Sequence, residues 1–112
     1  MSISTTIDGT TAVIRPRGEI DFDTLPALLA TAQKLPQPVT EVVWDLREAQ
    51  FMDVSALHLL VHQRLACQEA NRTLTVTGLS QQPQRLLQLA QELFPADQWS
   101  DFFPSGLSAA VA

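Results

Sequence analysis

The chain has 112 residues, of which 46% are hydrophobic and 17% are charged, values typical of one globular domain and not of disordered or fibrous proteins. Seven basic against twelve acidic residues give a formal net charge of −5, which argues against nucleic acid or an anionic membrane as the main partner. The apolar stretches are short, and the first residues carry neither a basic cluster nor a hydrophobic region. We therefore expect a single domain over residues 1–112, in the cytoplasm, without a transmembrane helix or signal peptide.

The first elements predicted along the chain are two antiparallel strands. Two β-prone runs, residues 3–7 and 11–15, flank an Asp-Gly pair at Asp8, which is a strong local signal for a β-hairpin. After a turn at residues 18–21, Asp23 is placed to cap a helix with Pro26 in its first turn. One face of that helix is apolar and consists of Leu25, Leu28, Leu29, Ala32 and Leu35.

The middle and end of the chain predict alternating strands and helices. Residues 42–46 form an almost continuous apolar run, typical of a central strand covered on both faces. A polar loop and Phe51-Met52 lead to Asp53, a plausible cap for a long helix over about residues 54–70, which Asn71 ends. Residues 73–77 alternate as a half-exposed strand, and a helix capped by Ser80 follows, reaching Leu93. Beyond Phe94 we expect a short strand or packed loop and then a small terminal helix.

This order, β-β-α-β-α-β-α, predicts an α/β fold with a mixed, mostly parallel sheet of four to five strands. In such sheets the loops after the carboxyl ends of the strands usually carry function. Three segments are therefore of most interest: residues 18–23, 45–55 and 78–82. The exposure of the edge strand at residues 73–77 leaves the oligomeric state open.

Ser55 lies in the first turn of the long helix predicted after Asp53. Most of that helix is apolar, and its polar sector holds Ser55, His58, His62 and Glu69, which we expect to form its exposed stripe. Free N–H groups and the helix dipole would stabilise a phosphate on Ser55. The alternative for Ser55 is an ordinary N-terminal serine that satisfies a backbone donor.

The sequence does not favour a metal site or an enzyme. His58 and His62 have the spacing of a metal-binding pair, but no general-base Glu lies between them and Glu69 is too far along the helix. Asp21, Asp45 and Asp53 could form an acidic pocket like that of a phosphate-accepting receiver domain, but the only lysine, Lys34, lies on the first helix. No nucleotide-binding loop or nucleophile with an adjacent base is present, and Cys67 is expected to be buried packing. We therefore expect no catalytic residue and no cofactor.

Four segments in order resemble the STAS domain family, specifically its stand-alone bacterial anti-sigma factor antagonists. They are Arg17-Gly18-Glu19-Ile20-Asp21, Val42-Val43-Trp44-Asp45-Leu46, Phe51-Met52-Asp53-Val54-Ser55-Ala56-Leu57 and Leu74-Thr75-Val76-Thr77-Gly78-Leu79-Ser80. The resemblance implies a STAS-type single domain. In the family the third segment usually reads Asp-Ser-Ser/Thr-Gly-Leu, and Ser55 occupies the position of the second hydroxyl residue, which is phosphorylated.

The resemblance implies regulation of transcription by partner switching. The unphosphorylated antagonist would bind an anti-sigma factor serine kinase, phosphorylation of Ser55 would weaken that binding, and a metal-dependent serine phosphatase would restore it. ATP would be bound by the kinase. The partner-binding residues would be Asp21, Asp53, Val54, Ser55, Ala56, His58 and His62. A phosphate would add about −1.5 to −2 charges beside Asp21 and Asp53.

Two departures from the family pattern leave an alternative function open. Val54 replaces the first hydroxyl residue, Ala56 replaces the glycine, and no lysine lies near the loop. These features favour a STAS interaction subunit that binds its partner constitutively, in a lipid-transport complex or a sensory assembly. The sequence does not identify the sigma factor or the pathway.

Overall fold

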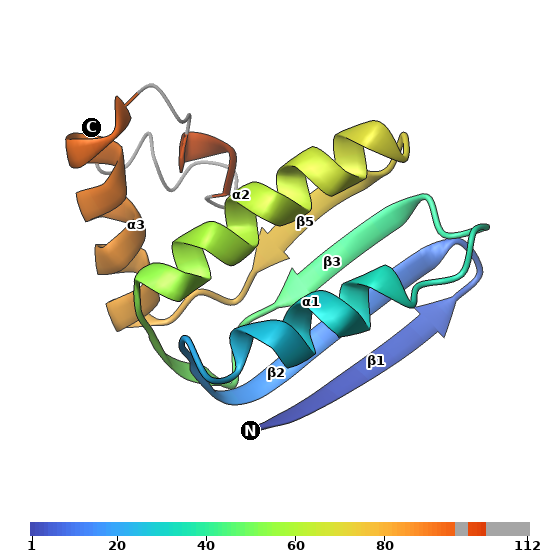
Figure 1. The fold of residues 1–112 in the computed structure, drawn as a ribbon, viewed down its shortest axis with the longest axis horizontal. Coiled ribbons are helices and arrows are strands. Elements are labelled where there is room, and N and C mark those ends of the chain that lie inside the picture. Colours follow the sequence, from blue (N-terminus) through green and yellow to red (C-terminus); the bar gives the residue numbers. More distant parts are fainter. Residues whose placement is uncertain (96–98, 103–112) are drawn as a thin grey trace.

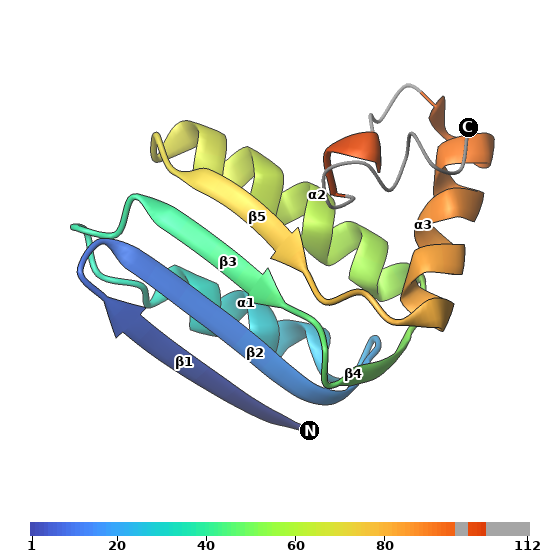
Figure 2. The same ribbon diagram turned by 180° about the vertical axis from the view of Figure 1, so that it is seen from behind.

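A mixed five-stranded sheet carries helices α1 (Leu25–Gln33) and α2 (Val54–Glu69) on one face, and no described helix covers its other face (Figures 1 and 2). The computed structural model describes residues 1–95 and 99–102. The strands are β1 (Ser2–Asp8), β2 (Thr11–Ile20), β3 (Glu41–Asp45), β4 (Ala49–Met52) and β5 (Thr73–Thr77). Helix α3 (Gln81–Leu93) stands at the end of the sheet beside the first turns of α2 (Figure 1). The predicted α/β fold with a mixed, mostly parallel sheet is confirmed.

The sheet has the order β1-β2-β3-β5, with β4 paired to the second half of β2. Only β1 and β2 are antiparallel, and they form the predicted hairpin, in which Asp8 faces Thr11 and Gly9 has a φ of 61°. The pairs β2–β3, β3–β5 and β2–β4 are parallel. Strands β1 and β5 are therefore the two edge strands of the β1-β2-β3-β5 order.

Strand β4 is an element that the sequence analysis does not predict, because residues 49–50 read as part of a polar loop. Its addition makes the order β-β-α-β-β-α-β-α. Strand β2 pairs with β4 from Gly18, opposite Ala49, to Ile20, opposite Met52, and the register of this pairing shifts between Gly18 and Glu19. The Gly18 N–H donates to the Glu48 carbonyl at 3.0 Å. Strand β2 thus pairs with β3 through Ile14 and with β4 from Gly18, whose φ is 113°, onward.

The predicted helix ends are confirmed for α2 and corrected for α1. Asp53 is the N-cap of α2, and Asn71 just beyond its end has a φ of 56°. In α1 the N-cap is Thr24 and not Asp23, because the carboxylate of Asp21 accepts the N–H groups of residues 23 and 24 and delays the helix by one residue. Ser80 is the N-cap of α3, without a side-chain capping bond.

The hydrophobic core lies between the sheet and the helices. Its largest fully buried side chains include Trp44 of β3, Ile14 and Ile20 of β2, Leu28 of α1 and Leu60 of α2. At the C-terminal end, a 3-10 helix at Trp99–Phe102 (η2) buries both of these aromatic rings, whose centroids are 6.0 Å apart. The segment expected to be a short strand or packed loop thus contains this single helical turn. The small terminal helix expected after it falls on residues 103–112, which lie outside the described residues.

Candidate functional site

The three segments singled out in the sequence meet at the carboxyl ends of the parallel strands. Strands β2 and β4 end together at Ile20 and Met52, and the Asp53 N–H donates to the Ile20 carbonyl at 3.1 Å. Asp21 and Asp53, the next residues of the two strands, therefore lie at the same edge of the sheet. The third segment joins them through Gln82, which donates to the Met52 carbonyl at 2.8 Å and accepts from the Met52 N–H at 2.9 Å.

Both of these aspartates are oriented by backbone N–H groups. Oδ1 of Asp21 accepts from the backbone of Asp23 at 3.0 Å and of Thr24 at 3.1 Å. Oδ1 of Asp53 accepts from the backbone of Ser55 at 2.7 Å, the bond of a helix N-cap. Two fixed carboxylates thus lie near the start of α2.

Ser55 is half-buried in the first turn of α2, and its hydroxyl takes no part in capping. Asp53 satisfies the backbone N–H of Ser55, and within residues 1–95 and 99–102 the Ser55 hydroxyl makes no hydrogen bond. The alternative role for Ser55, that of an ordinary capping serine, is therefore taken by Asp53. The hydroxyl stands at the positive end of a 16-residue helix, where a negative charge is favoured.

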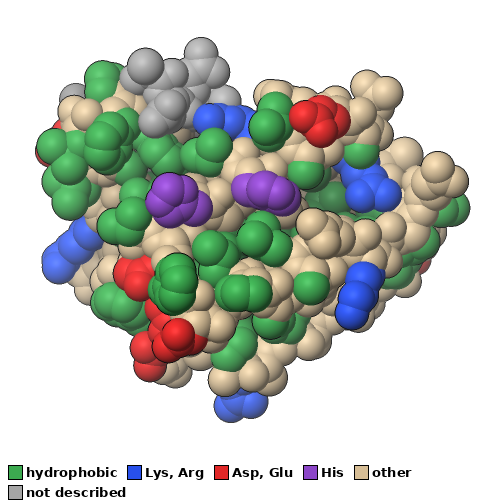
Figure 3. All heavy atoms as spheres, viewed as in Figure 1, with side chains coloured by type: hydrophobic (Ala, Val, Ile, Leu, Met, Phe, Trp, Pro, Cys, Tyr) green, Lys and Arg blue, Asp and Glu red, His purple; other side chains and the backbone are tan. Residues whose placement is uncertain are grey.

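The exposed side of α2 is less polar than the sequence indicated. His58, His62 and Glu69 are exposed as expected, but Val61 and Leu65, which lie outside the predicted exposed stripe, are exposed too. Val54 is 61% exposed, whereas Ala56 is fully buried, so its side chain does not reach the surface. Figure 3 shows the two histidines side by side among hydrophobic side chains, with acidic groups close to one of them.

The apolar side chains of α2 continue into a shallow groove against α3 and η2. Val54, Leu57, His58, Val61, Phe94 and Trp99 line this groove. Since Phe94 is also half-exposed, the face of α2 beyond Ser55 presents a mainly apolar surface with two histidines.

Asp45 does not join Asp21 and Asp53 in an acidic pocket. Its carboxylate is almost fully buried and is paired with Arg47 at 2.7 Å and Arg15 at 2.9 Å. The hydrogen bonds from Arg47, together with that from Arg15, hold the pKa of Asp45 well below its usual range, against the opposing effect of burial. No local pattern predicts this network, because Arg15 comes from β2, thirty residues away. Within the described part of the chain, no group of three or more His, Cys, Asp or Glu side chains is arranged to hold a metal ion.

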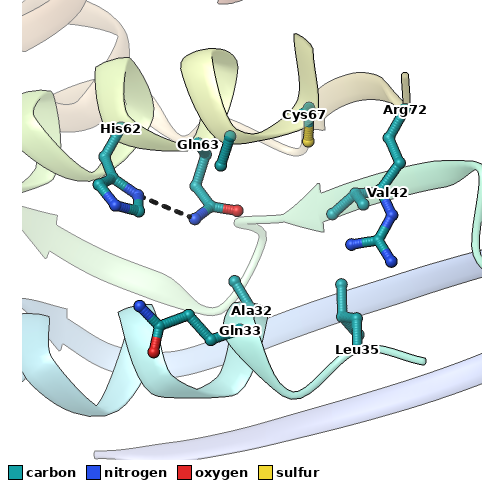
Figure 4. A pocket seen from close by; sticks show the side chains of 9 residues that line it. Ala32, Gln33, Leu35, Val42, His62, Gln63, Cys67 and Arg72 are labelled. Carbon is teal, nitrogen blue, oxygen red and sulfur yellow. Dashed lines mark hydrogen bonds between the residues drawn. The ribbon is translucent and has the colours of Figure 1, made fainter. Parts of the chain in front are cut away.

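A second hollow lies between α1 and α2 (Figure 4). Gln63 points into it from α2, is buried, and accepts the indole N–H of Trp44 at 3.3 Å, while its amide nitrogen lies 3.4 Å from Nδ1 of His62. Cys67 is buried here as predicted, and burial raises the pKa of its thiol. Arg72 closes the hollow by donating to the Val39 and Pro36 carbonyls.

Comparisons with known proteins bear on the fold and the family. The chain matches the family model described as "Mlab, STAS domain" over residues 3–91. No curated protein sequence matches it significantly. Within the described ranges, no helix is long and apolar enough to cross a membrane.

Three solved structures of anti-sigma factor antagonists and their relatives have the same fold. The anti-sigma factor antagonist SpoIIAA in its unphosphorylated form has a TM-score of 0.71 at 16% identity, over 98% of this chain and 93% of that one. The Bacillus cell fate determinant SpoIIAA in the phosphorylated form has a TM-score of 0.67 at 17% identity, over 98% and 96%. An anti-sigma factor antagonist from Mycobacterium paratuberculosis has a TM-score of 0.62 at 21% identity, over 98% and 90%.

Proposed function

Since the chain belongs to the STAS domain family, we propose that it is a cytoplasmic anti-sigma factor antagonist switched off by phosphorylation of Ser55. In its unphosphorylated form it binds an anti-sigma factor serine kinase through the surface around Asp21, Asp53, Val54 and Ser55, extending along α2 to His58 and His62. Ala56 contributes by fixing the helix backbone beneath this surface. The likeness in fold to antagonists such as SpoIIAA supports this proposal. ATP belongs to the kinase, and a metal-dependent serine phosphatase reverses the modification.

The observation that carries the proposal is the state of the Ser55 hydroxyl. Ser55 is only half-buried, and within the described part of the molecule no hydrogen bond commits its hydroxyl to the fold, because Asp53 caps the helix. Phosphorylation there adds about −1.5 to −2 charges at neutral pH without removing a structural bond. The helix N-terminus tolerates the added charge, so the modified domain stays folded.

The effect of phosphorylation is therefore expected at the interface with the partner. A phosphate on Ser55 lies beside the carboxylates of Asp21 and Asp53, and a partner that covers this surface must desolvate all three groups. A cost of about 1.4 kcal/mol already weakens binding tenfold, and a buried like-charge contact costs more than that.

The test needs a serine kinase, to be sought among the products of the neighbouring genes, and uses Ser80 as a matched control. Ser80 is also a serine at a helix N-terminus and makes no side-chain capping bond. With ATP, intact mass should show one added phosphoryl group in the wild type and in Ser80→Ala, and none in Ser55→Ala. Ser55→Glu should bind the kinase at least tenfold more weakly with an unchanged Tm, whereas Ser80→Glu should bind normally. A phosphate that persists in Ser55→Ala, or its absence with a kinase that binds, would contradict the proposal.

The exposed apolar line on α2 favours a second candidate, a constitutive STAS subunit of a larger complex such as a lipid-transport or sensory assembly. Val61 and Leu65 continue the line from Val54 at helical spacing, and an apolar surface of this kind suits a permanent partner. In this case Val61→Asp should abolish assembly with the partner, and Ser55→Glu should leave it intact. The reverse pattern of the two variants would exclude this candidate.

A further inference from the structure

The edge of the sheet at β1 is open. Strand β1 is the last strand on its side of the sheet, and in Figures 1 and 2 no other described element lies beyond it. It pairs with β2 over seven residues without a register shift. Its sequence, Ser-Ile-Ser-Thr-Thr-Ile-Asp, contains no lysine or proline, and its single charge is at the end. Soluble proteins usually protect such an edge with lysine, proline, a bulge or a covering segment, so this strand is suited to pairing with another strand.

The register of the hairpin shows which backbone groups of β1 point outward. The two-residue turn after Asp8 makes Asp8 and Thr11 a hydrogen-bonded pair. Because hydrogen-bonded and non-hydrogen-bonded pairs alternate along an antiparallel ladder, the even-numbered residues of β1 bond to β2. The N–H and C=O groups of Ile3, Thr5 and Ile7 therefore face away from the sheet.

We propose that this edge pairs with β1 of a second copy of the chain, antiparallel, around a two-fold axis at Thr5. The strand has the same pattern in both directions from Thr5: serine or threonine at one residue and isoleucine at two residues on either side. With the axis at Thr5, the outward groups of Thr5 meet those of the partner's Thr5, and Ile3 meets the partner's Ile7. This arrangement forms about six backbone hydrogen bonds and joins the two sheets into one.

The side chains of β1 fit this pairing. Thr5 lies opposite the buried Ile14 of β2, so Ile3, Thr5 and Ile7 are on the helix-facing side of the sheet. Ile3 already packs against the core, whereas Ile7 is 47% exposed. In the pair each Ile7 lies against the partner's Ile3, so the apolar layer continues across the axis.

Charge and symmetry also favour a second copy as the occupant. Asp8 lies opposite the partner's Ser2, and the two Asp8 carboxylates are at opposite ends of the paired strands, about 20 Å apart at 3.4 Å per residue. Since each copy contributes the same strand to the contact, the assembly is a closed dimer with no unpaired β1 edge.

The opposite edge of the sheet is a weaker candidate for self-pairing. Strand β5 has five residues against seven in β1. On its helix-facing side, Leu74 lines a hollow together with Phe102 and Arg64, so η2 lies beside this strand. A β1–β5 contact between copies would be head-to-tail and would leave a free edge at each end.

The proposed dimer does not depend on the proposed function. None of the residues that pair across β1 belongs to the surface assigned to the kinase, so variants at Thr5 and at Ser55 test the two proposals separately. If one proposal fails its test, the other proposal still stands and is tested separately.

The experiment measures mass in solution by size-exclusion chromatography with light scattering, from micromolar to millimolar protein. The wild type should reach about twice its 12.3 kDa mass. Thr5→Lys places two ammonium groups opposite each other at the axis and should give a monomer with an unchanged Tm. Thr75→Lys, the same change on the exposed face of β5, is the matched control and should stay dimeric.

A second variant probes the backbone directly. Thr5→Pro removes an N–H that points outward and leaves the bonds to β2 in place, so it should fold and be monomeric. If it does not fold, Thr5→Lys still decides the question. A wild type that remains monomeric throughout the concentration range overturns the proposal. A folded Thr5→Lys that is still dimeric, or loss of the dimer in Thr75→Lys, overturns the assignment to β1.

Discussion

Replacement of Asp53 by alanine should destabilise the domain markedly, whereas replacement of Ser55 should not. Oδ1 of Asp53 accepts the Ser55 N–H at 2.7 Å from an extended backbone, the geometry of an N-cap. Loss of such a cap costs about 1 kcal/mol, and loss of a carboxylate near the positive end of the helix dipole adds about 0.3–1 kcal/mol. At about 4–8 °C per kcal/mol for a domain of this size class, Asp53→Ala should lower Tm by about 5–16 °C.

Two further variants separate the contributions to this loss, measured by thermal and urea unfolding followed by circular dichroism. Asp53→Asn keeps an acceptor oxygen and removes the charge, so it should lose only the dipole contribution of about 0.3–1 kcal/mol. Ser55→Ala removes a hydroxyl that makes no hydrogen bond within the described residues, and its stability should stay within about 0.5 kcal/mol of the wild type. If Ser55→Ala loses as much as Asp53→Ala, the Ser55 hydroxyl is a structural group and the reasoning that leaves it available for modification is wrong.

Two other predictions concern the buried carboxylate at the end of β3 and the glycine against it. The pKa of Asp45 is lower in the folded protein than in the unfolded chain, so this carboxylate stabilises the fold above about pH 4 and the contribution is lost as pH falls further. Wild type should therefore exceed Asp45→Asn in urea stability at pH 7, with the gap narrowing at pH 3; parallel pH curves would contradict this. A Cβ on residue 78, whose φ is 76°, would lie 2.9 Å from the backbone nitrogen of Arg47. Gly78→Ala should therefore lower the free energy of unfolding by more than about 1 kcal/mol. Gly9→Ala, with a similar φ and open space around it, should cost less, and equal losses would show that the close approach is relieved.

The elements whose signals are local were predictable from the sequence. The Asp-Gly turn at Asp8 makes the hairpin, and Asp53 and Asn71 bracket α2 with a cap and a left-handed residue. In each case the side chain that sets the boundary acts on a backbone group within a few residues, so no knowledge of the rest of the fold is needed.

Strand β4 was missed because nothing local marks it as a strand. Its four residues have a buried-exposed-exposed-buried pattern and not the alternation of a regular strand. What makes it a strand is the pairing with the end of β2, from Gly18 to Ile20, and that partner comes far earlier in the chain.

The burial of α2 was misjudged for a related reason. Apolar residues cover most of its circumference, but the sheet lies on one side only, so Val61 and Leu65 remain exposed. Gln63, which interrupts the apolar surface in the sequence, is buried, and its amide oxygen accepts the indole N–H of Trp44 of β3. A helical wheel shows which residues share a face but not which face the fold covers.

The pairing of Asp45 with two arginines bears on how a phosphate at Ser55 would act. A receiver-like pocket would need three neighbouring carboxylates to hold a cation, yet Asp45 is neutralised by Arg15 and Arg47. The carboxylates left near Ser55 are those of Asp21 and Asp53, both fixed by backbone N–H groups. Because these two carboxylates are held in place, they would not move away from an added phosphate. The negative charge would therefore accumulate on the surface of α2, where an incoming partner must accommodate it, and the fold beneath would remain unchanged.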